Sequence, residues 1–92
     1  MVLLIKLYGD LKSKLLDLPN YNRESNTLRI KLNNVKNITD ILGKLSIKKE
    51  EISHIFVNNK YSGLEKELKE GDRIGIFPKR MGILFVEIKD PF

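Results

Sequence analysis

The segment at residues 68–78, Leu-Lys-Glu-Gly-Asp-Arg-Ile-Gly-Ile-Phe-Pro, constrains the fold of this chain more than any other. Gly71 gives the backbone the freedom for a sharp reversal, and Asp72 can bond local backbone groups, so the pair predicts a tight turn. The apolar run that follows at residues 74–77, Ile-Gly-Ile-Phe, has the length of a strand buried on both faces. Because Pro78 cannot donate a ladder hydrogen bond, the strand should end there. The sequence therefore predicts a core strand that is entered through a turn and ends at a proline.

Length and composition limit the class of protein. A chain of 92 residues is long enough for one hydrophobic core and too short for two, and its contents of 41% hydrophobic and 32% charged residues are typical of a globular domain. No apolar stretch reaches the roughly 18 residues of a membrane-spanning helix. The apolar start at residues 2–5 lacks a basic leader, so we interpret it as a strand rather than a signal peptide. We expect a cytoplasmic protein without a membrane partner.

The sequence shows no arrangement typical of an active site. The absence of cysteine excludes disulfides, thiolate nucleophiles and cysteine-based metal sites. The single histidine, His54, has no evident metal-ligating partner, and we interpret it as a surface residue before a strand. The glutamates at positions 50, 51, 65, 67 and 70 are interpreted as solvated side chains rather than paired catalytic carboxylates. Since no nucleophile elbow, phosphate loop or zinc motif occurs, we predict a non-enzyme with no cofactor and no metal.

The net charge of +5 raises the question of nucleic acid as a partner. Most of the 17 basic residues are lysines, and they are spread along the whole chain. Nucleic-acid sites favour arginines that cluster with aromatic residues. The sequence therefore does not favour nucleic acid as the partner.

Hydrophobic periodicity predicts further strands. Residues 2–7 are almost continuously apolar, which is typical of a strand in the middle of a sheet. Residues 27–32 alternate between apolar and polar side chains, which predicts a half-exposed strand nearer an edge. Residues 55–57 predict another strand, and the Asn58-Asn59 pair that follows tolerates the positive φ of a tight turn.

Two segments carry helical periodicity. Residues 11–18 place leucines at helical spacing and predict a short helix. In the second segment Asn37 can cap a helix whose first turn contains Asp40, and an apolar stripe follows at positions 38, 41, 42 and 45. Gly43 lies within this helix, which suggests close packing there or an early end.

The order of these elements predicts an α+β fold. One main amphipathic helix must cover one face of a mixed sheet of four to five strands. A right-handed crossover is expected where the connected strands are parallel. The ubiquitin-like β-grasp satisfies this order, with the first and last core strands paired in the centre. We assign it to residues 1–82, and we assign residues 83–92 to a C-terminal extension that forms an additional strand.

Four segments carry a resemblance to a known family. They are Ile-Lys-Leu-Tyr-Gly-Asp-Leu at 5–11, Ile-Thr-Asp-Ile-Leu at 38–42, Ile-Phe-Val-Asn-Asn at 55–59 and the segment at 68–78. Together they make residues 1 to 82 similar to the ubiquitin-like sulfur carriers of the MoaD and ThiS type. The resemblance implies docking to a protein partner in sulfur transfer or in cofactor biosynthesis of the molybdopterin or thiamine type. It implies an adenylating enzyme or a molybdopterin-synthase-like large subunit as that partner.

The chain departs from this family after the proline. Carriers of this type end there in Gly-Gly, and their terminal carboxylate is adenylated and converted to a thiocarboxylate. Residues 78–82, Pro-Lys-Arg-Met-Gly, contain a single glycine, and Ile83 follows. The resemblance therefore implies a divergent member that is not competent as a carrier unless it is processed after Gly82. The alternative hypothesis is a β-grasp RNA-binding module of the TGS type.

The basic pair Lys79-Arg80 directly after the core strand has two interpretations: two exposed charges that end the strand and protect a sheet edge, or contacts to an acidic groove on a partner protein. The candidate partner-docking residues are Phe77, Lys79, Arg80, Met81 and Gly82.

The C-terminal segment at residues 83–88, Ile-Leu-Phe-Val-Glu-Ile, is strongly apolar. Burial of each large apolar side chain contributes roughly 1.5–3 kcal/mol, in a protein stable by only about 5–15 kcal/mol, so this segment should not be a flexible tail. We predict an added strand that packs on the domain or pairs with a second copy. A homodimer is therefore expected rather than a monomer.

Overall fold

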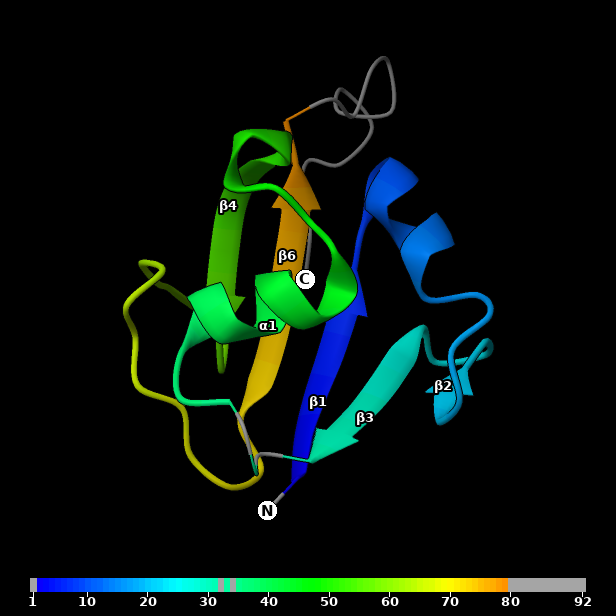
Figure 1. The fold of residues 1–92 in the computed structure, drawn as a ribbon, viewed down its shortest axis with the longest axis horizontal. Helices are drawn as coiled ribbons and strands as arrows, with labels where there is room; N and C mark the ends of the chain where they lie inside the picture. Colours follow the sequence, from blue (N-terminus) through cyan, green and yellow to red (C-terminus); the bar gives the residue numbers. More distant parts are fainter. Residues whose placement is uncertain (1, 32, 34, 80–92) are drawn as a thin grey trace.

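A mixed sheet and one main helix make up the fold of the computed structural model, which describes residues 2–31, 33 and 35–79 (Figure 1). Within these described residues the sheet has six strands in the order β2-β3-β1-β6-β4-β5. The strands are β1 (Val2–Leu7), β2 (Tyr21–Asn22), β3 (Thr27–Lys31), β4 (Ile52–Val57), β5 (Lys60–Tyr61) and β6 (Arg73–Pro78), and the helices are α1 (Ile38–Leu45) and the 3-10 helices η1 (Gly9–Lys14) and η2 (Lys49–Glu51). The predicted α+β class is confirmed.

The first and last of these core strands, β1 and β6, lie side by side in the centre of the sheet. They are parallel, with Ile5 opposite Ile74 and Leu7 opposite Ile76. β3 pairs antiparallel with the other edge of β1, and β4 pairs antiparallel with the other edge of β6. Both strands are bonded along both edges, and apart from Lys6 and Arg73 their sequences carry no charge, as is typical of strands in the middle of a sheet. The predicted central pairing is confirmed.

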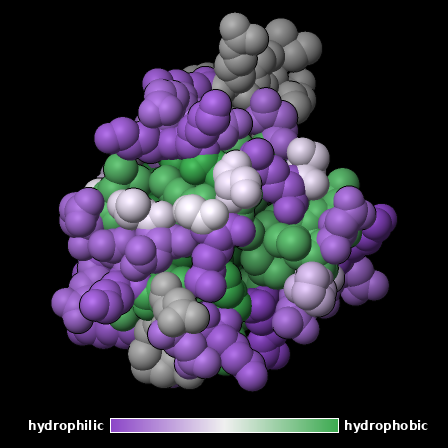
Figure 2. All heavy atoms as spheres, in the orientation of Figure 1, coloured by the Kyte–Doolittle hydropathy of each residue, from purple (hydrophilic) through white to green (hydrophobic). Residues whose placement is uncertain are grey.

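The hydrophobic core lies between the sheet and α1. The fully buried side chains of this layer alternate along β1 and β6 and recur along the inner side of α1: they are Leu3, Ile5, Leu7, Ile38, Ile41, Ile74 and Ile76. At roughly 1.5–3 kcal/mol for each large apolar side chain, this layer is the main source of stability. Seen from the α1 side, hydrophilic side chains surround the hydrophobic ones (Figure 2). Because α1 covers only one face of the sheet, the opposite face has no helix over it in the part of the chain that the structure describes.

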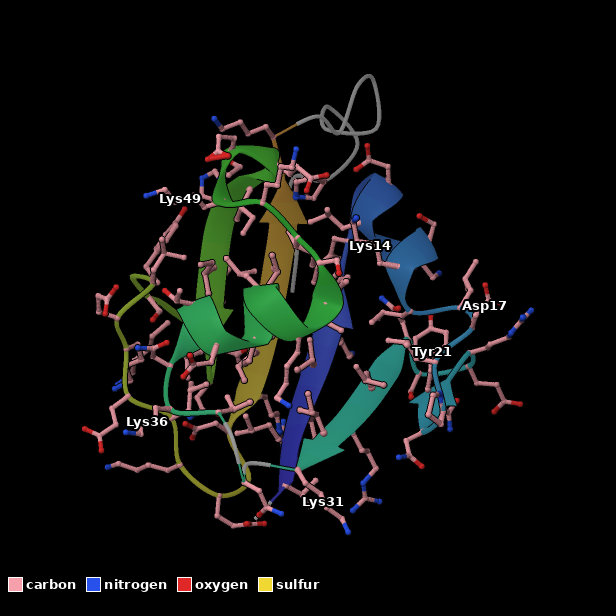
Figure 3. All side chains as sticks on the ribbon, in the orientation of Figure 1. Lys14, Asp17, Tyr21, Lys31, Lys36 and Lys49 are labelled. Atoms are coloured by element: carbon pink, nitrogen blue, oxygen red, sulfur yellow. The ribbon has the colours of Figure 1, made fainter. Side chains whose placement is uncertain are left out.

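The helix α1 begins and ends as its sequence predicts. Asn37 Oδ1 accepts the backbone N–H of Asp40 at 3.1 Å, and Asp40 Oδ2 accepts the N–H of Asn37 at 3.3 Å, which together form a capping box. The helix ends at Ser46, whose φ of 57° is left-handed. Lys14 of η1 lies beside this end (Figure 3), where its Nζ donates to the Ser46 carbonyl at 3.2 Å. The cation complements the negative end of the helix dipole.

Close packing at Gly43, one of the two explanations offered for this glycine, is wrong. A methyl group at this position would meet no atom within 4 Å. The other explanation, an early end of the helix, is wrong as well, because α1 continues past Gly43 to Leu45, the last position of the predicted apolar stripe, before the left-handed Ser46.

The helix predicted at residues 11–18 is wrong in type and extent. The segment forms the shorter η1, and the bonds from Leu15 N to the Lys12 carbonyl and from Leu18 N to the Leu15 carbonyl, both 3.0 Å, span three residues. Leu11 and Leu15 are buried, but Leu18 is 36% exposed and does not belong to the predicted stripe. The following Pro19 disfavours helical backbone at Leu18, so the helical pattern has no room to extend.

Two tight turns meet at the start of β6. Asn58 and Asn59 have φ values of 52° and 68°, and Gly71 has a φ of 81°, as predicted for both turns. Asp72 is 8% exposed, and its Oδ2 accepts the N–H of Lys69 at 2.8 Å while its Oδ1 accepts Nδ2 of Asn58 at 2.9 Å. Asn58 Oδ1 in turn accepts the N–H of Arg73 at 3.0 Å. The Asp72 carboxylate therefore ties the β4–β5 turn to the entrance of β6.

The predicted C-terminal strand at residues 83–88, and the homodimer that it would form, lie outside the described residues. Within residues 2–31, 33 and 35–79, no helix has the length and apolar character needed to cross a membrane.

Candidate functional site

The face of the sheet opposite α1, which we call the open face, carries the most distinctive side chains of the protein. Since Leu3, Ile5 and Leu7 point toward α1, the alternating residues of β1 point the other way. The pairing registers then place the following residues on the open face: Leu4, Lys6, Arg29, Lys31, Phe56, Tyr61, Arg73, Gly75 and Phe77. The aromatic and basic residues of this set come from every strand except β2.

Aromatic rings form a continuous cluster on the open face. The rings of Tyr8 and Phe77 are stacked, with centroids 4.2 Å apart and an interplanar angle of 5°. Phe56 meets Phe77 edge-on at 5.6 Å and lies 4.5 Å from Tyr61. His54 follows at 5.6 Å from Tyr61. We call these five residues the aromatic cluster; it runs from Tyr8, directly after β1, across β6 and β4 to β5.

Exposure differs along the aromatic cluster. Phe77 is 8% exposed, whereas Tyr61 is 73% exposed. Burial raises the pKa of the Tyr8 hydroxyl above its ordinary value of 10.0, so Tyr8 is neutral at physiological pH. The cluster therefore has a packed centre around Phe77 and an accessible end at Tyr61.

The absence of a side chain at Gly75 leaves a hollow in the open face. A methyl group at Gly75 would lie 3.4 Å from Cε2 of Tyr8 and 4.0 Å from Cε1 of Phe77. Next to these rings opens a cavity of about 280 Å³, which we call the Gly75 hollow. Aromatic and basic residues share its wall, which is formed mainly by Lys6, Tyr8, Phe56, Asn59, Arg73 and Gly75.

Two basic residues, Lys6 and Arg73, line the Gly75 hollow, and further basic side chains lie on the same face. Leu4 is paired with Arg29 on one side and with Arg73 on the other, so the two arginines flank Leu4 in one row across the sheet. Lys6 occupies the next row, opposite Gly75. At the open-face positions of the described strands there is no aspartate or glutamate. The open face is therefore aromatic and cationic.

The structure describes two of the five predicted docking residues. Phe77 lies on the open face, within the aromatic cluster. Lys79 follows the end of β6, with an exposed side chain and a backbone N–H that donates to the Glu51 carbonyl at 2.9 Å. Arg80, Met81 and Gly82 lie outside the described residues.

Other open-face residues were not singled out from the sequence. Tyr8, Phe56 and Tyr61 lie close to Phe77 or to each other in space, but far apart along the chain. A signal was available at Phe56, because it alternates with Ile55 and Val57, which belong to the core. Its alternation therefore marks it as an aromatic residue on the other face of the strand.

The remaining polar candidates do not form a catalytic or metal-binding arrangement in the part of the chain that the structure describes. His54 is partly buried beside Tyr61, and its Nδ1 is hydrogen-bonded to Ser53 Oγ. Glu50, Glu51, Glu65, Glu67 and Glu70 are exposed. Among the described residues no group of three or more His, Cys, Asp or Glu side chains could hold a metal ion. What the open face offers chemically is stacking, apolar contact and positive charge.

A mixed sheet with a parallel central pair and one covering helix defines the ubiquitin-like β-grasp fold. The chain belongs to the Mut7-C ubiquitin family, whose model matches residues 4–83. A comparison with curated proteins found no match.

Solved structures share this fold at low sequence identity. SAMP1 from Haloferax volcanii matches with a TM-score of 0.60 and 17% identity, over 89% of this chain and 99% of that one. A putative molybdopterin converting factor subunit 1 from Pyrococcus furiosus matches with a TM-score of 0.58 and 18% identity, over 85% of this chain and 97% of that one. Subunits 1 and 2 of the molybdopterin-converting factor from Helicobacter pylori were solved as a complex, one chain of which matches with a TM-score of 0.53 and 19% identity, over 89% and 99%. The predicted resemblance in fold to MoaD-type proteins is confirmed.

Proposed function

We propose that this protein is a non-catalytic ubiquitin-like protein that acts by docking to a partner protein in sulfur transfer or cofactor biosynthesis. The partner is an adenylating enzyme or a large subunit of the molybdopterin-synthase kind. The docking surface is the end of β6 with the residues that follow it: Phe77, Lys79, Arg80, Met81 and Gly82. The extension at residues 83–92 then makes the unprocessed chain incompetent as a carrier.

The observation that carries this proposal is the rigid exit of the chain from β6. This strand lies between β1 and β4 in the centre of the sheet, so it is held along both edges. The bond from Lys79 N to the Glu51 carbonyl holds the chain beyond Pro78 as well. A partner that must receive the segment after β6 benefits from such an exit, because little conformational freedom is lost on binding.

The similar structures support a protein partner. The Helicobacter pylori protein of this fold was solved in a complex with a second subunit. Fold likeness alone does not assign a function, so the docking residues of this chain must be tested directly.

Intact mass spectrometry of the protein isolated from its native cells tests the carrier part of the proposal. A working carrier requires a chain that ends at Gly82, with or without the mass change of a thiocarboxylate. Only such a chain would keep the carrier hypothesis, whereas a chain that retains residues 83–92 agrees with a divergent, docking-only protein.

Calorimetric titration tests the docking part. The protein is titrated into the adenylating enzyme and into the large subunit encoded in the same genome. Lys79→Glu should weaken binding to the true partner about tenfold or more, because like charges are then placed against its acidic groove. Lys66→Glu is the matched control, since Lys66 is equally exposed but lies in the segment leading away from β5. Absence of binding to both candidate proteins, or equal effects of the two variants, would refute the proposed surface.

A further inference from the structure

We propose that four cations on the open face form a docking patch for an acidic protein surface. They are Lys6, Arg29, Lys31 and Arg73, which we call the basic patch. The inference rests on the proposed function, because the acidic surface belongs to the same partner protein. It adds a second contact that is separate from the end of β6.

The registers of three strands bring these side chains together around Leu4. Arg29 of β3 and Arg73 of β6 are both paired with Leu4, so their Cα atoms are two strand spacings apart, about 10 Å. Lys6 lies roughly 7 Å from Leu4 along β1, and Lys31 lies equally far from Arg29 along β3 (Figure 3). All four cations are exposed, whereas Leu4 is partly buried. The basic patch is therefore a rigid array of cations with an apolar centre.

The basic patch is not neutralised by the described part of the chain. None of its side chains forms an ion pair with a described carboxylate. Four carboxylates instead accept backbone N–H groups at 2.8 Å, those of Asp40, Glu51, Glu70 and Asp72. Like charges that face one another on neighbouring strands destabilise a sheet. An acidic partner would relieve this repulsion on binding, and the gain would favour the complex.

The residue types of the basic patch suit a protein interface. The guanidinium groups of Arg29 and Arg73 can each hold a carboxylate through two parallel hydrogen bonds, which fixes the orientation of the partner. Arginine is enriched at protein interfaces, where polar and charged groups surround an apolar centre. Leu4 occupies that central position here.

The basic patch is continuous with the proposed docking surface. Arg73 begins β6 and Pro78 ends it, and Phe77 of the same strand lies on the open face. The distance from Arg73 to Lys79 along this strand is roughly 20 Å. A standard protein interface covers about 800 Å² on each partner, which is wide enough to include both ends of β6. One partner protein can therefore receive the end of β6 and contact the basic patch at the same time.

Other polyanions fit the basic patch less well. Unpaired nucleic-acid bases need free ring faces, but Phe77 is only 8% exposed and is stacked on Tyr8. A membrane surface needs apolar side chains that insert beside the cations. The exposed large hydrophobic residues of the described chain are Leu16, Leu18 and Tyr61, and none of them adjoins Leu4 in the sheet. An acidic protein surface needs neither feature.

Biolayer interferometry with the immobilised partner tests the basic patch through the association rate. The adenylating enzyme and the large subunit encoded in the same genome are the two partners tested. Arg29→Glu with Arg73→Glu should slow association about tenfold or more at low salt, and the difference from wild type should shrink as salt screens the charges. Lys44→Glu with Lys66→Glu is the matched control, because it changes the net charge equally. Lys44 lies on α1, and Lys66 lies in the segment that is hydrogen-bonded to α1.

Two further measurements separate docking from a structural role. The Arg29→Glu and Arg73→Glu variant should melt at the same temperature as wild type or higher, because its new carboxylates lie near Lys6 and Lys31. If it melts lower, Arg29→Gln with Arg73→Gln takes its place, and this variant should also slow association. Carbodiimide cross-linking joins a lysine amine to a carboxylate that contacts it. Mass spectrometry should therefore find Lys6 or Lys31 linked to the partner.

The outcomes are distinct. Slower association of the arginine variants, with the lysine control close to wild type and cross-links from Lys6 or Lys31, supports the basic patch. Equal slowing by the control would show general attraction between a basic and an acidic protein and would overturn the proposal.

The failure of this inference can be told from the failure of the proposed function. If Lys79→Glu weakens binding but the arginine variants associate like wild type, the end of β6 is the docking surface and the basic patch is not. If neither partner binds the wild-type protein, the proposed function fails and this inference fails with it. If the arginine variants keep partner binding but lose binding to duplex RNA or to vesicles of anionic phospholipid, the patch serves another polyanion and the proposal is wrong.

Discussion

Replacing Asp72 by alanine should destabilise the protein strongly, although Asp72 is not part of the hydrophobic core. Its carboxylate accepts the N–H of Lys69 at 2.8 Å and Nδ2 of Asn58 at 2.9 Å, and only 8% of the residue is exposed. It therefore joins the turn that enters β6 to the turn between β4 and β5. Without it, both donors lose their partner at a partly buried position.

The size of the effect follows from the bonds that are lost. Hydrogen bonds to a charged group contribute about 1.5–3 kcal/mol each. The two bonds share one carboxylate and the exposed Asn58 can turn toward water, so their contributions are not fully additive. We expect the free energy of unfolding of Asp72→Ala to fall by about 2–4 kcal/mol, and its melting temperature to fall by roughly 8–30 °C, at about 4–8 °C per kcal/mol for a domain of this size.

Urea unfolding followed by far-ultraviolet circular dichroism measures this change. The midpoint should shift while the m-value stays constant, which shows that stability rather than the denatured state has changed. Asp72→Asn should lose about half as much unfolding free energy as Asp72→Ala, because the single amide oxygen of asparagine can still accept one of the two hydrogen bonds. Asp17→Ala is the matched control, since Asp17 extends into solvent from an exposed turn (Figure 3). A loss below about 1 kcal/mol for Asp72→Ala, or a loss no larger than that of Asp17→Ala, would contradict the argument.

Further substitutions test the helix and the aromatic cluster. Asn37→Ala removes one half of the capping box and should lower the free energy of unfolding by about 1 kcal/mol, as measured by urea titration. An unchanged free energy of unfolding would mean that the capping box contributes little. Gly43→Ala should raise the free energy of unfolding by roughly 0.5–1 kcal/mol, because the added methyl group meets no atom within 4 Å. A loss of stability in this variant would show that the glycine is needed. Tyr8→Phe should change how stability depends on alkaline pH. Since burial raises the pKa of Tyr8 above 10.0, its contribution is complete below pH ~10 and is lost as the pH rises through the higher folded value, so wild type should lose more stability than Tyr8→Phe in this range. Parallel stability curves for these two proteins would refute the assignment.

Local patterns in the sequence determined most of the secondary structure. The capping pair Asn37 and Asp40, the Asn58-Asn59 turn and Gly71 could be predicted because each acts on backbone within a few residues. The apolar runs of β1 and β6 indicated central strands, and the observed strand order places both in the centre of the sheet. The prediction for residues 11–18 was wrong because Leu11 and Leu15 pack into the core without a full α-helix, and spacing alone does not distinguish the two cases.

The candidate site was only partly predictable. Phe77 and Lys79 follow from the position of the β6 segment in the chain, since a resemblance to carriers directs attention to the residues around the terminal proline. Alternation could place Phe56 on the outer face of its strand, but the proximity of Tyr8, Phe56 and Tyr61 to Phe77 or to each other depends on which strands become neighbours.

The distribution of charge shows most clearly what tertiary structure decided. Along the chain, Lys6, Arg29 and Arg73 are isolated cations, which is why the sequence did not favour nucleic acid as a partner. The parallel pairing of β1 with β6 and the antiparallel pairing of β1 with β3 place Arg73 and Arg29 on either side of Leu4, one row from Lys6. Periodicity determines which face of a strand a side chain occupies, but strand order and register determine its neighbours on that face. Those depend on how the whole core packs, and no local pattern contains that information.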